Sequence, residues 1–132
     1  MDKIEKIKFM IKANEIRLGN YFFDADGNEK QIDYSDLVAL QITSLHFSPI
    51  PLTPERLERC QLEYLSDPIN GYELTKHICI VKNATGYSLC VIETSVNGGE
   101  YVSEIRRIDY LHELQNITLD LTGEELEIKK LT

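Results

Sequence analysis

Three runs of strand-forming residues between Tyr72 and Ile108 constrain the fold of this chain more than any other feature of the sequence. They cover Leu74 to Val81, Tyr87 to Glu93 and Tyr101 to Ile108, and each is rich in β-branched and aromatic residues. Glycine-containing turns separate the runs. Because runs joined by such short turns usually pair with their neighbours in the chain, the pattern predicts a three-stranded antiparallel meander.

The turn between the first two runs also predicts their register. If this turn is centred between Ala84 and Thr85, Cys79 lies directly across from Cys90 in the neighbouring strand. Directly opposed residues bring their Cβ atoms to within ~5.5 Å, so the two thiols should be close. Two interpretations stay open, namely a reduced buried pair and a redox-active pair that forms a disulfide. The same register predicts two further opposed pairs, Ile80 with Leu89 and Ile78 with Val91.

An Asp-Gly step predicts a further hairpin nearer the N-terminus. The aromatic run Tyr21–Phe23 precedes a polar string over residues 24–29, in which Gly27 supplies the positive φ that a tight turn requires. The returning strand is expected over Lys30 to Tyr34. The next residues, Asp36 to Gln41, fit either a strand or a helical turn, and periodicity does not decide between them.

Capping residues predict two short helices. Residues 2–12 carry isoleucines at helical spacing behind a capping-box arrangement. After the extended segment Pro49–Leu52, the tripeptide Thr53–Glu55 offers a capping threonine, a first-position proline and an acidic residue in that order. We therefore expect a short central helix with Leu57 and Cys60 on its buried side.

A longer helix is predicted near the C-terminus. Asp109 is its expected N-cap, the helix runs to about Leu121, and Gly123 stands where a left-handed C-cap is expected. One apolar stripe of this helix should face the core, formed by Tyr110, Leu114, Ile117 and Leu121. The alternating segment 126–131 is expected to add an edge strand.

Together these elements predict an α+β fold. The hairpin and the meander are expected to form one curved antiparallel sheet, with a small open barrel as its alternative form, and the 109–121 helix should cover one face. The 132 residues contain no linker, so we expect a single domain over 1–132, with residues 1–13 as an N-terminal helical extension. A chain of this length can bury about two thirds of its unfolded surface, which is enough for one core.

The net charge and the spacing of the cysteines limit which partners and which cellular compartment we expect. The chain carries 14 basic against 22 acidic residues, a net charge of −8, and lacks the basic stripe that binds a phosphate backbone. Direct nucleic-acid binding is therefore not expected. No stretch approaches ~18 apolar residues without a charge, so a transmembrane span is not expected. The shortage of basic residues makes an anionic membrane surface no better a partner than nucleic acid. The three cysteines show no CxxC spacing, which favours a reducing cytoplasm. Exposed strand edges leave homodimer formation open.

The sequence predicts no catalytic, cofactor-binding or metal site. Placing Gly27 at the glycine position of a calcium loop puts Phe22 at its first ligand position, and a hydrophobe cannot bind calcium. His46, His77 and His112 lack the paired spacing of a zinc site with the cysteines. Neither a nucleophile elbow nor a glycine-rich phosphate loop is present. We therefore expect a protein that is not an enzyme and needs no cofactor.

Three stretches resemble a group of small uncharacterised proteins carried by phages and prophage-like elements of gut anaerobes. Residues 14–21 (N-E-I-R-L-G-N-Y) are similar to the group's N-E-L-R-I-G-N-Y, and residues 49–57 (P-I-P-L-T-P-E-R-L) to its P-I-P-L-T-E-E-W-L. Residues 111–116 (L-H-E-L-Q-N) and 121–126 (L-T-G-E-E-L) are similar to its H-x-L-Q-N-L-Y and L-T-G-x-E-L. The chain differs by its N-terminal helix and by Asn116-Ile117-Thr118, where the group prefers an aromatic residue.

This resemblance implies a mobile genetic element in a bacterial cytoplasm as the setting, and no catalytic activity. The expected function is that of a non-enzymatic accessory protein that acts through contacts with an unknown protein partner. The alternative is an acidic inhibitor that imitates nucleic acid and occupies the basic groove of a host DNA-binding enzyme. Its carboxylates would come from residues 24–36 and 55–73.

Overall fold

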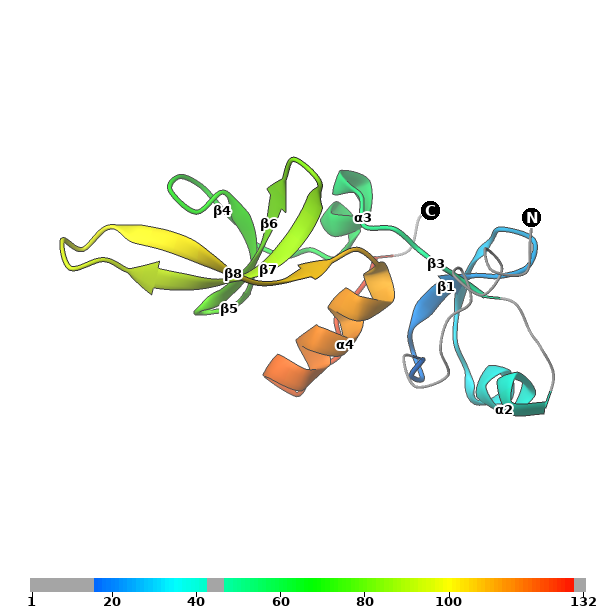
Figure 1. Cartoon of the computed structure of the whole chain (residues 1–132). Coiled ribbons are helices and arrows are strands. Elements are labelled where there is room, and N and C mark those ends of the chain that lie inside the picture. Colours follow the sequence, from blue (N-terminus) through cyan, green and yellow to red (C-terminus); the bar gives the residue numbers. More distant parts are fainter. Residues whose placement is uncertain (1–15, 43–46, 130–132) are drawn as a thin grey trace. The chain divides into compact units, whose positions relative to one another are not determined.

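The computed structural model describes residues 16–42 and 47–129 (Figure 1), and it has the predicted α+β fold. The expected N-terminal helix over 2–12 lies outside the described residues. The elements follow one another in the order β1 (Tyr21–Phe23), β2 (Glu29–Gln31), α2 (Tyr34–Ile42), β3 (Ser48–Pro49), α3 (Pro54–Arg59), β4 (Tyr64–Leu65), β5 (Gly71–Thr75), β6 (Ile78–Asn83), β7 (Gly86–Thr94), β8 (Glu100–Ile108) and α4 (Leu111–Thr122).

The strands form two antiparallel sheets, which corrects the expectation of one curved sheet. A three-stranded sheet has the order β2-β1-β3, and a five-stranded sheet has the order β4-β5-β6-β7-β8. Both sheets are open, so the barrel alternative was wrong. The two-residue strand β3 pairs with β1, with Phe22 opposite Pro49, and completes the three-stranded sheet.

The described chain divides into two compact units. The first contains the described residues up to Pro51 together with Tyr110–Asn116, and the second contains Leu52–Asp109 together with the residues from Ile117 onward. Helix α4 thus contributes its first half to one unit and its second half to the other. Compactness is a different property from independent folding, so the expectation of a single domain stays a prediction.

In the first unit, the Asp-Gly hairpin is confirmed. The Asp24 N–H donates to the Asn28 carbonyl at 2.9 Å, and the Asp24 carboxylate accepts hydrogen bonds from the N–H groups of Asp26 and Asn28. Gly27 has φ +81°, as the turn requires. The returning strand β2 ends at Gln31, which is earlier than expected.

The segment after this hairpin is the helix α2, which resolves the open alternative between strand and helix. Asp33 and Asp36 form a reciprocal capping box, because each carboxylate accepts a hydrogen bond from the other residue's N–H, at 2.9 and 3.0 Å. Beside this helix lies a small core of Phe22, Ile32 and Phe47, against which Leu37 packs.

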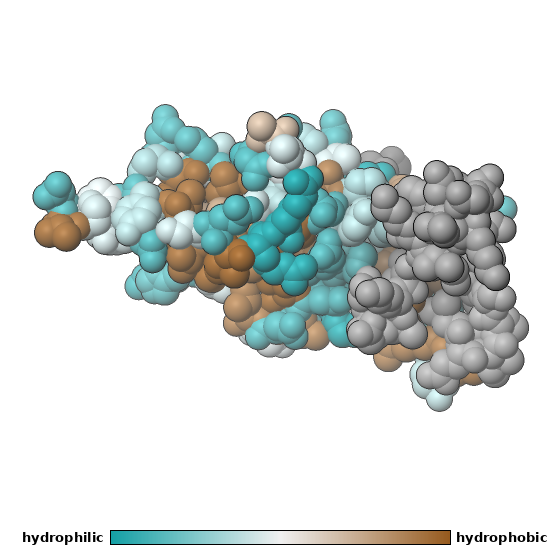
Figure 2. Space-filling model, viewed as in Figure 1, coloured by the Kyte–Doolittle hydropathy of each residue, from teal (hydrophilic) through white to brown (hydrophobic). Residues whose placement is uncertain are grey.

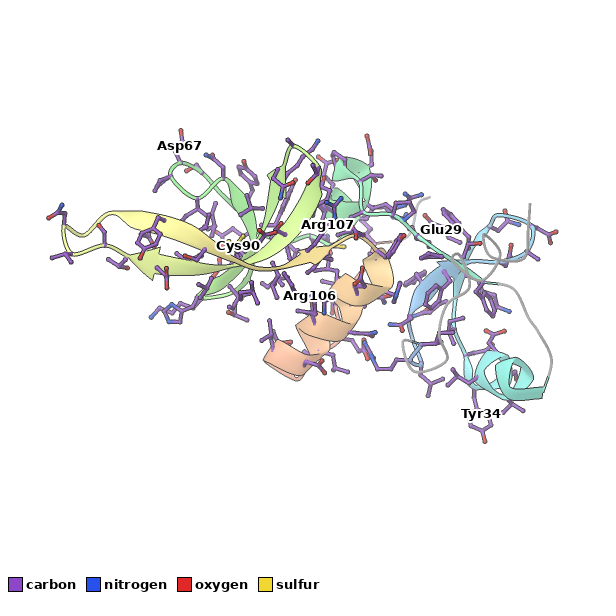
Figure 3. The ribbon with its side chains drawn as sticks, in the orientation of Figure 1. Glu29, Tyr34, Asp67, Cys90, Arg106 and Arg107 are labelled. Carbon is purple, nitrogen blue, oxygen red and sulfur yellow. The ribbon has the colours of Figure 1, made fainter. Side chains whose placement is uncertain are left out.

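In the second unit, the predicted register of the meander is confirmed. Cys79 pairs with Cys90, and both further opposed pairs, Ile80 with Leu89 and Ile78 with Val91, are also present. The turn between the strands lies at Ala84 and Thr85, because Asn83 pairs with Gly86. Cys90, labelled in Figure 3, packs with Cys79 and Ile69 in a buried cluster.

The first run of the meander was wrong in one respect: Leu74 to Val81 is not one strand. A tight turn at Lys76 and His77 divides it into β5 and β6, since Thr75 pairs with Ile78. Neither turn residue is a glycine or proline, so the usual turn signals are missing. The sheet also gains β4, which pairs with β5 through Tyr64 and Tyr72.

The central helix α3 is confirmed. The Thr53 hydroxyl accepts a hydrogen bond from the Arg56 N–H at 3.2 Å, and Pro54 lies in the first turn. Leu57 is completely buried and Cys60 is 4% exposed, as the sequence predicted.

Helix α4 corrects the predicted cap and apolar stripe. It begins at Leu111, so Tyr110 rather than Asp109 precedes it, and the Tyr110 N–H donates to the Glu113 carboxylate at 3.1 Å. Leu121, expected in the core, is 46% exposed. The C-cap is confirmed, because Gly123 has φ +73° and its N–H donates to the Leu119 carbonyl.

The C-terminal segment is not the expected edge strand over its described residues, 126–129. It lies instead against the end of α3. The Lys129 N–H donates to the Arg59 carbonyl at 2.7 Å, and the Arg59 Nε–H donates to the Lys129 carbonyl at 2.9 Å. Leu126 is buried in this position.

Candidate functional site

A buried polar network in the first unit joins the loop before β1 to the first half of α4. The Gln115 side chain is 2% exposed, and its amide accepts a hydrogen bond from the Tyr21 N–H at 2.8 Å and donates one to the Gly19 carbonyl at 2.9 Å. Gly19 adopts φ +87°, a conformation that favours glycine. Gln115 therefore holds this loop by its main chain.

Asn20 and Arg17 complete this network. Asn20 is fully buried; its Oδ1 accepts from the Arg17 N–H at 2.8 Å and its Nδ2 donates to Asn116 Oδ1 at 2.8 Å. The Arg17 Nε–H donates to the same Asn116 oxygen at 2.9 Å. Asn116 thus accepts two hydrogen bonds from a loop that is 96 or more residues away in the sequence.

The second resembling stretch, residues 49–57, meets the same helix at Ile50 and Pro51. The Leu111 N–H donates to the Ile50 carbonyl at 2.8 Å, and Ile50 is fully buried. Pro51 forms an isolated bridge with Tyr110. The stretches at residues 16–21, 49–51 and 110–116 therefore come together in one unit. Their amides and guanidinium bind main-chain and side-chain partners inside the fold, which is a structural role.

His112 lies beside this network and is 3% exposed. Its ring centre is 4.7 Å from that of Phe22 and 5.9 Å from that of Tyr110, with the tyrosine ring nearly parallel. The other candidate zinc ligands are elsewhere: His77 is exposed in the β5–β6 turn, and His46 is outside the described residues. Among the described side chains, no three His, Cys, Asp or Glu residues gather as a metal site would require.

All three cysteines are reduced and buried. Burial, and then the neighbouring Cys90, raises the pKa of the Cys79 thiol to about 11. Burial likewise raises the pKa of Cys60 to about 11 and raises that of Cys90, to which Glu104 adds. Because the thiolate is the reactive form, these pKa values and this burial favour the interpretation of an inert pair at Cys79 and Cys90.

A buried serine lies close to this cysteine pair on the sheet. The Ser88 hydroxyl donates to Glu104 Oε1 at 2.5 Å and accepts from Asn83 Nδ2 at 2.9 Å. Ser88 is 3% exposed, and its hydroxyl proton is held by the carboxylate. This arrangement ties β6, β7 and β8 together.

Two sets of charged residues singled out in the sequence also stabilise local structure. In the acidic stretch 24–36, Asp24 holds the hairpin turn, and Asp36 pairs with the Lys30 ammonium at 2.8 Å. The sequence also has two adjacent arginines, Arg106 and Arg107, both labelled in Figure 3. The Arg107 guanidinium donates to the Thr85 hydroxyl and carbonyl and pairs with Asp109.

Exposed glutamates of α3 and tyrosines of β4 and β5 form a surface of the second unit that the sequence did not predict. Tyr64 is 54% exposed, and its ring meets that of Tyr72 edge to face at 5.2 Å. Burial, and then the charge of Glu58, raises the pKa of Tyr72. Burial, then Tyr72 and then Glu55 raise the pKa of the buried Tyr87.

We call Glu55, Glu58, Tyr64 and Tyr72 the acidic tyrosine face. Both glutamates are exposed, and neither forms an ion pair within the described part of the chain. No spacing along the chain marks this face, because the contact of Tyr64 with Tyr72 depends on the pairing of β4 with β5.

Other large apolar side chains of the second unit are exposed as well. Val96 is fully exposed in the turn between β7 and β8, and Tyr101 and Ile105 on the edge strand β8 are 47% and 54% exposed. Figure 2 shows hydrophobic residues among hydrophilic ones over the five-stranded sheet and a hydrophobic residue at the tip of the β7–β8 hairpin. Ile105 is the extra residue of a bulge, since Leu89 pairs with Arg106 and Cys90 with Glu104.

The comparisons with known proteins leave the family open: no family model, curated protein or solved structure matches this chain. No helix in the described part of the chain is long and apolar enough to cross a membrane.

Proposed function

We propose that this chain is a non-enzymatic accessory protein of a phage or integrated mobile element, and that it acts in a bacterial cytoplasm through protein–protein contacts. The observation that carries the proposal is the exposure of large side chains on the second unit, at Tyr64, Val96, Tyr101 and Ile105. Aromatic residues are enriched at protein interfaces, and covering exposed apolar groups with a partner stabilises the complex.

The placement of the resembling stretches supports this division of roles. Their polar residues, Asn20, Gln115 and Asn116, are held in the hydrogen bonds of the first unit. Because these polar residues are used within the fold, we assign the protein contacts to side chains that remain accessible. The mobile-element setting is supported by the resemblance of these stretches.

A second candidate function is the acidic inhibitor that imitates nucleic acid. The observation that favours it is the set of exposed carboxylates without an ion pair in the described chain, at Glu55, Glu58 and Glu63. The stretch 24–36 weakens it, because the Asp24 carboxylate stabilises a turn and the Asp36 carboxylate stabilises the start of α2. A mimic should bind a DNA-binding enzyme in direct competition with DNA, whereas an accessory protein should bind its partner whether or not DNA is present.

The experiment is affinity purification of the tagged full chain from its own host, followed by quantitative mass spectrometry. We expect one or a few proteins to be enriched over a tag-only control and to remain bound after nuclease treatment. Enrichment that disappears when competing DNA is added supports the mimic instead. The absence of any enriched protein, in growing and in prophage-induced cells, contradicts both candidates.

A further inference from the structure

We propose that the outer edge of β8 binds an extended segment of a protein partner as a further antiparallel strand, with basic side chains of that segment opposite Glu100 and Glu104. This inference rests on the proposed function and specifies where the partner binds and what chemistry it brings.

Strands β7 and β8 form the long hairpin at the left of Figure 1, and β8 is the last strand of the five-stranded sheet. Within the described chain, no further strand pairs with its outer side. An edge strand presents unpaired N–H and C=O groups, which can pair with an extended segment of another chain. Because β8 has nine residues and the opposite edge strand β4 has two, β8 is the edge at which such pairing can form.

Two hydrogen bonds of β7 show which main-chain groups of β8 face outward. The Ser95 N–H donates to the Gly99 carbonyl at 2.7 Å, and hydrogen-bonded and non-hydrogen-bonded pairs alternate along an antiparallel ladder from there. The register of the strands then places every second residue of β8 from 100 to 104 at a non-hydrogen-bonded position. The Ile92 N–H agrees, because it donates to the His77 carbonyl on the side of β7 away from β8. Three residues therefore direct their N–H and C=O groups away from β7: Glu100, Val102 and Glu104.

The side chains of these three residues share one face of the sheet, because side chains alternate between faces along a strand. Glu100 and Glu104 are exposed, and the half-buried Val102 packs against the buried cluster of Cys79 and Cys90. Neither glutamate forms an ion pair within the described part of the chain. A strand that pairs at this edge therefore meets two carboxylates, one on each side of an apolar residue.

The two arginines of β8 do not neutralise these carboxylates. They follow the bulge at Ile105, which interrupts the alternation of the strand. Arg106 pairs with Leu89 beyond the bulge, and the Arg107 guanidinium is held by Thr85 and Asp109. The sequence has no Lys or Arg over residues 93–104, so the part of β8 before the bulge is acidic.

This edge distinguishes among the possible partners. A helix bonds its own N–H and C=O groups internally and cannot pair with those of β8. A second copy that used all three outward residues would place Glu100 opposite Glu104, and directly opposed like charges destabilise strand pairing. An extended segment with basic, apolar and basic residues at positions i, i+2 and i+4 meets both carboxylates and Val102. The same segment would partly cover Tyr101, which is 47% exposed on the other face of β8.

The test uses the full-length chain and the synthetic peptide Gly-Ser-Lys-Thr-Val-Thr-Lys-Ser-Gly, with NMR of the backbone amides as the readout at low salt. At millimolar peptide, the amide signals of Glu100, Val102 and Glu104 should shift saturably. A peptide with glutamate in place of both lysines should bind about tenfold more weakly, because two attractive pairs become repulsive. If the two peptides bind equally, or if these amides do not shift, the proposal is overturned.

Two methylated peptides test whether the main chain of the segment is bound. In the proposed pairing the N–H of the peptide valine points toward β8, and the N–H groups of its threonines point away. N-methylation of the valine should therefore abolish the shifts, whereas N-methylation of the following threonine should leave them nearly unchanged. Equal binding by the two methylated peptides overturns the proposal.

A charge exchange locates the binding edge. Glu100→Lys should weaken binding of the lysine peptide about three- to tenfold and strengthen binding of the glutamate peptide. Glu124→Lys is the matched control, because Glu124 is exposed beyond α4 and the change in net charge is the same. Circular dichroism confirms that each variant is folded. If Glu124→Lys has the same effect as Glu100→Lys, the peptide responds only to overall charge and the proposed edge is wrong.

Two further outcomes overturn the proposal in different ways. If the amide signals of residues 100–104 already change with the concentration of the chain alone, a second copy occupies this edge. The partner capture described above separates failure at β8 from failure of the proposed function. A partner that the Glu100→Lys/Glu104→Gln double variant captures as well as wild type refutes this edge and leaves the protein-contact function standing.

Discussion

Replacing Gln115 by leucine should destabilise the first unit, because the buried Gln115 side chain makes two hydrogen bonds that leucine cannot make. The side chain is 2% exposed and makes two hydrogen bonds, to the Tyr21 N–H at 2.8 Å and to the Gly19 carbonyl at 2.9 Å. Leucine has a similar volume but makes neither bond. The Gly19 carbonyl keeps a partner in Gln31 Nε2 at 3.2 Å, whereas the Tyr21 N–H loses the bond that Gln115 provides.

The magnitude follows from these two differences. Each net hydrogen bond contributes about 1 kcal/mol, and a buried donor left without an acceptor costs about 1–3 kcal/mol. Because the carbonyl is partly compensated, we expect Gln115→Leu to lower the free energy of unfolding of the first unit by about 2–4 kcal/mol.

Two assays together test this prediction. Urea unfolding gives the free energy, and amide hydrogen exchange by NMR should show faster exchange of the Tyr21 N–H in the variant. Gln31→Leu is the control, because its bond to Gly19 is exposed, and it should change the free energy by at most about 0.5 kcal/mol. If Gln115→Leu equals the control and the Tyr21 amide stays protected, the structural role assigned to this glutamine is wrong.

Three further predictions concern cysteine ionisation, glycine packing and acid stability. Burial raises the pKa values of Cys79 and Cys90 in the folded chain, so these thiols contribute stability below pH ~9 that should be lost as the pH rises toward 11. Cys79→Ala should make the free energy of unfolding, measured with urea at several pH values, fall less over this range. An unchanged fall in the variant refutes the prediction. Gly71→Ala should cost about 1–3 kcal/mol, because a Cβ there would lie 2.8 Å from a backbone carbonyl oxygen, whereas Gly99→Ala should be nearly neutral; equal unfolding midpoints contradict this. Burial opposes ionisation of Asp36, but hydrogen bonds outweigh burial and lower the pKa of this carboxyl. The free energy of unfolding should therefore fall as the pH drops through 3.8 and below. Asp36→Asn should make this fall smaller in acid titrations followed by circular dichroism.

The hairpins were predictable because their turns carry local information. The pairing of Cys79 with Cys90 follows once the turn is placed at Ala84 and Thr85, since each residue along the strand then has a fixed partner. The turn at Lys76 and His77 has no such signature, and the sequence pattern alone joins β5 and β6 into one strand. Local chemistry thus predicted the register of this one hairpin, whose turn lies just before Gly86.

The buried face of α4 was not predictable from apolar periodicity. Gln115 and Thr118 are buried there, whereas Leu121 is 46% exposed. The partners of Gln115 are main-chain groups 94 and 96 residues away, and a hydrophobicity pattern has no information about them. The available signal was the polar Gln-Asn pair inside an otherwise amphipathic helix, which indicates a buried hydrogen-bonding role once a loop is known to lie beside it.

The acidic tyrosine face was missed for a related reason. Tyr64 belongs to a strand of two residues, and its contact with Tyr72 depends on the pairing of β4 with β5. Neither the short strand nor the proximity of Glu58 can be derived from spacing along the chain. This surface therefore depends on tertiary structure.

The most direct test of the division between an architectural first unit and an interacting second unit is residue-resolved hydrogen exchange of the full chain, alone and bound to its captured partner. Binding should slow exchange within residues 54–75 and 96–108 and leave residues 16–21 and 110–116 unchanged. Slowed exchange concentrated at Arg17–Tyr21 and Leu111–Asn116 would show that the partner binds the motif segments themselves, and it would contradict the structural role assigned to them.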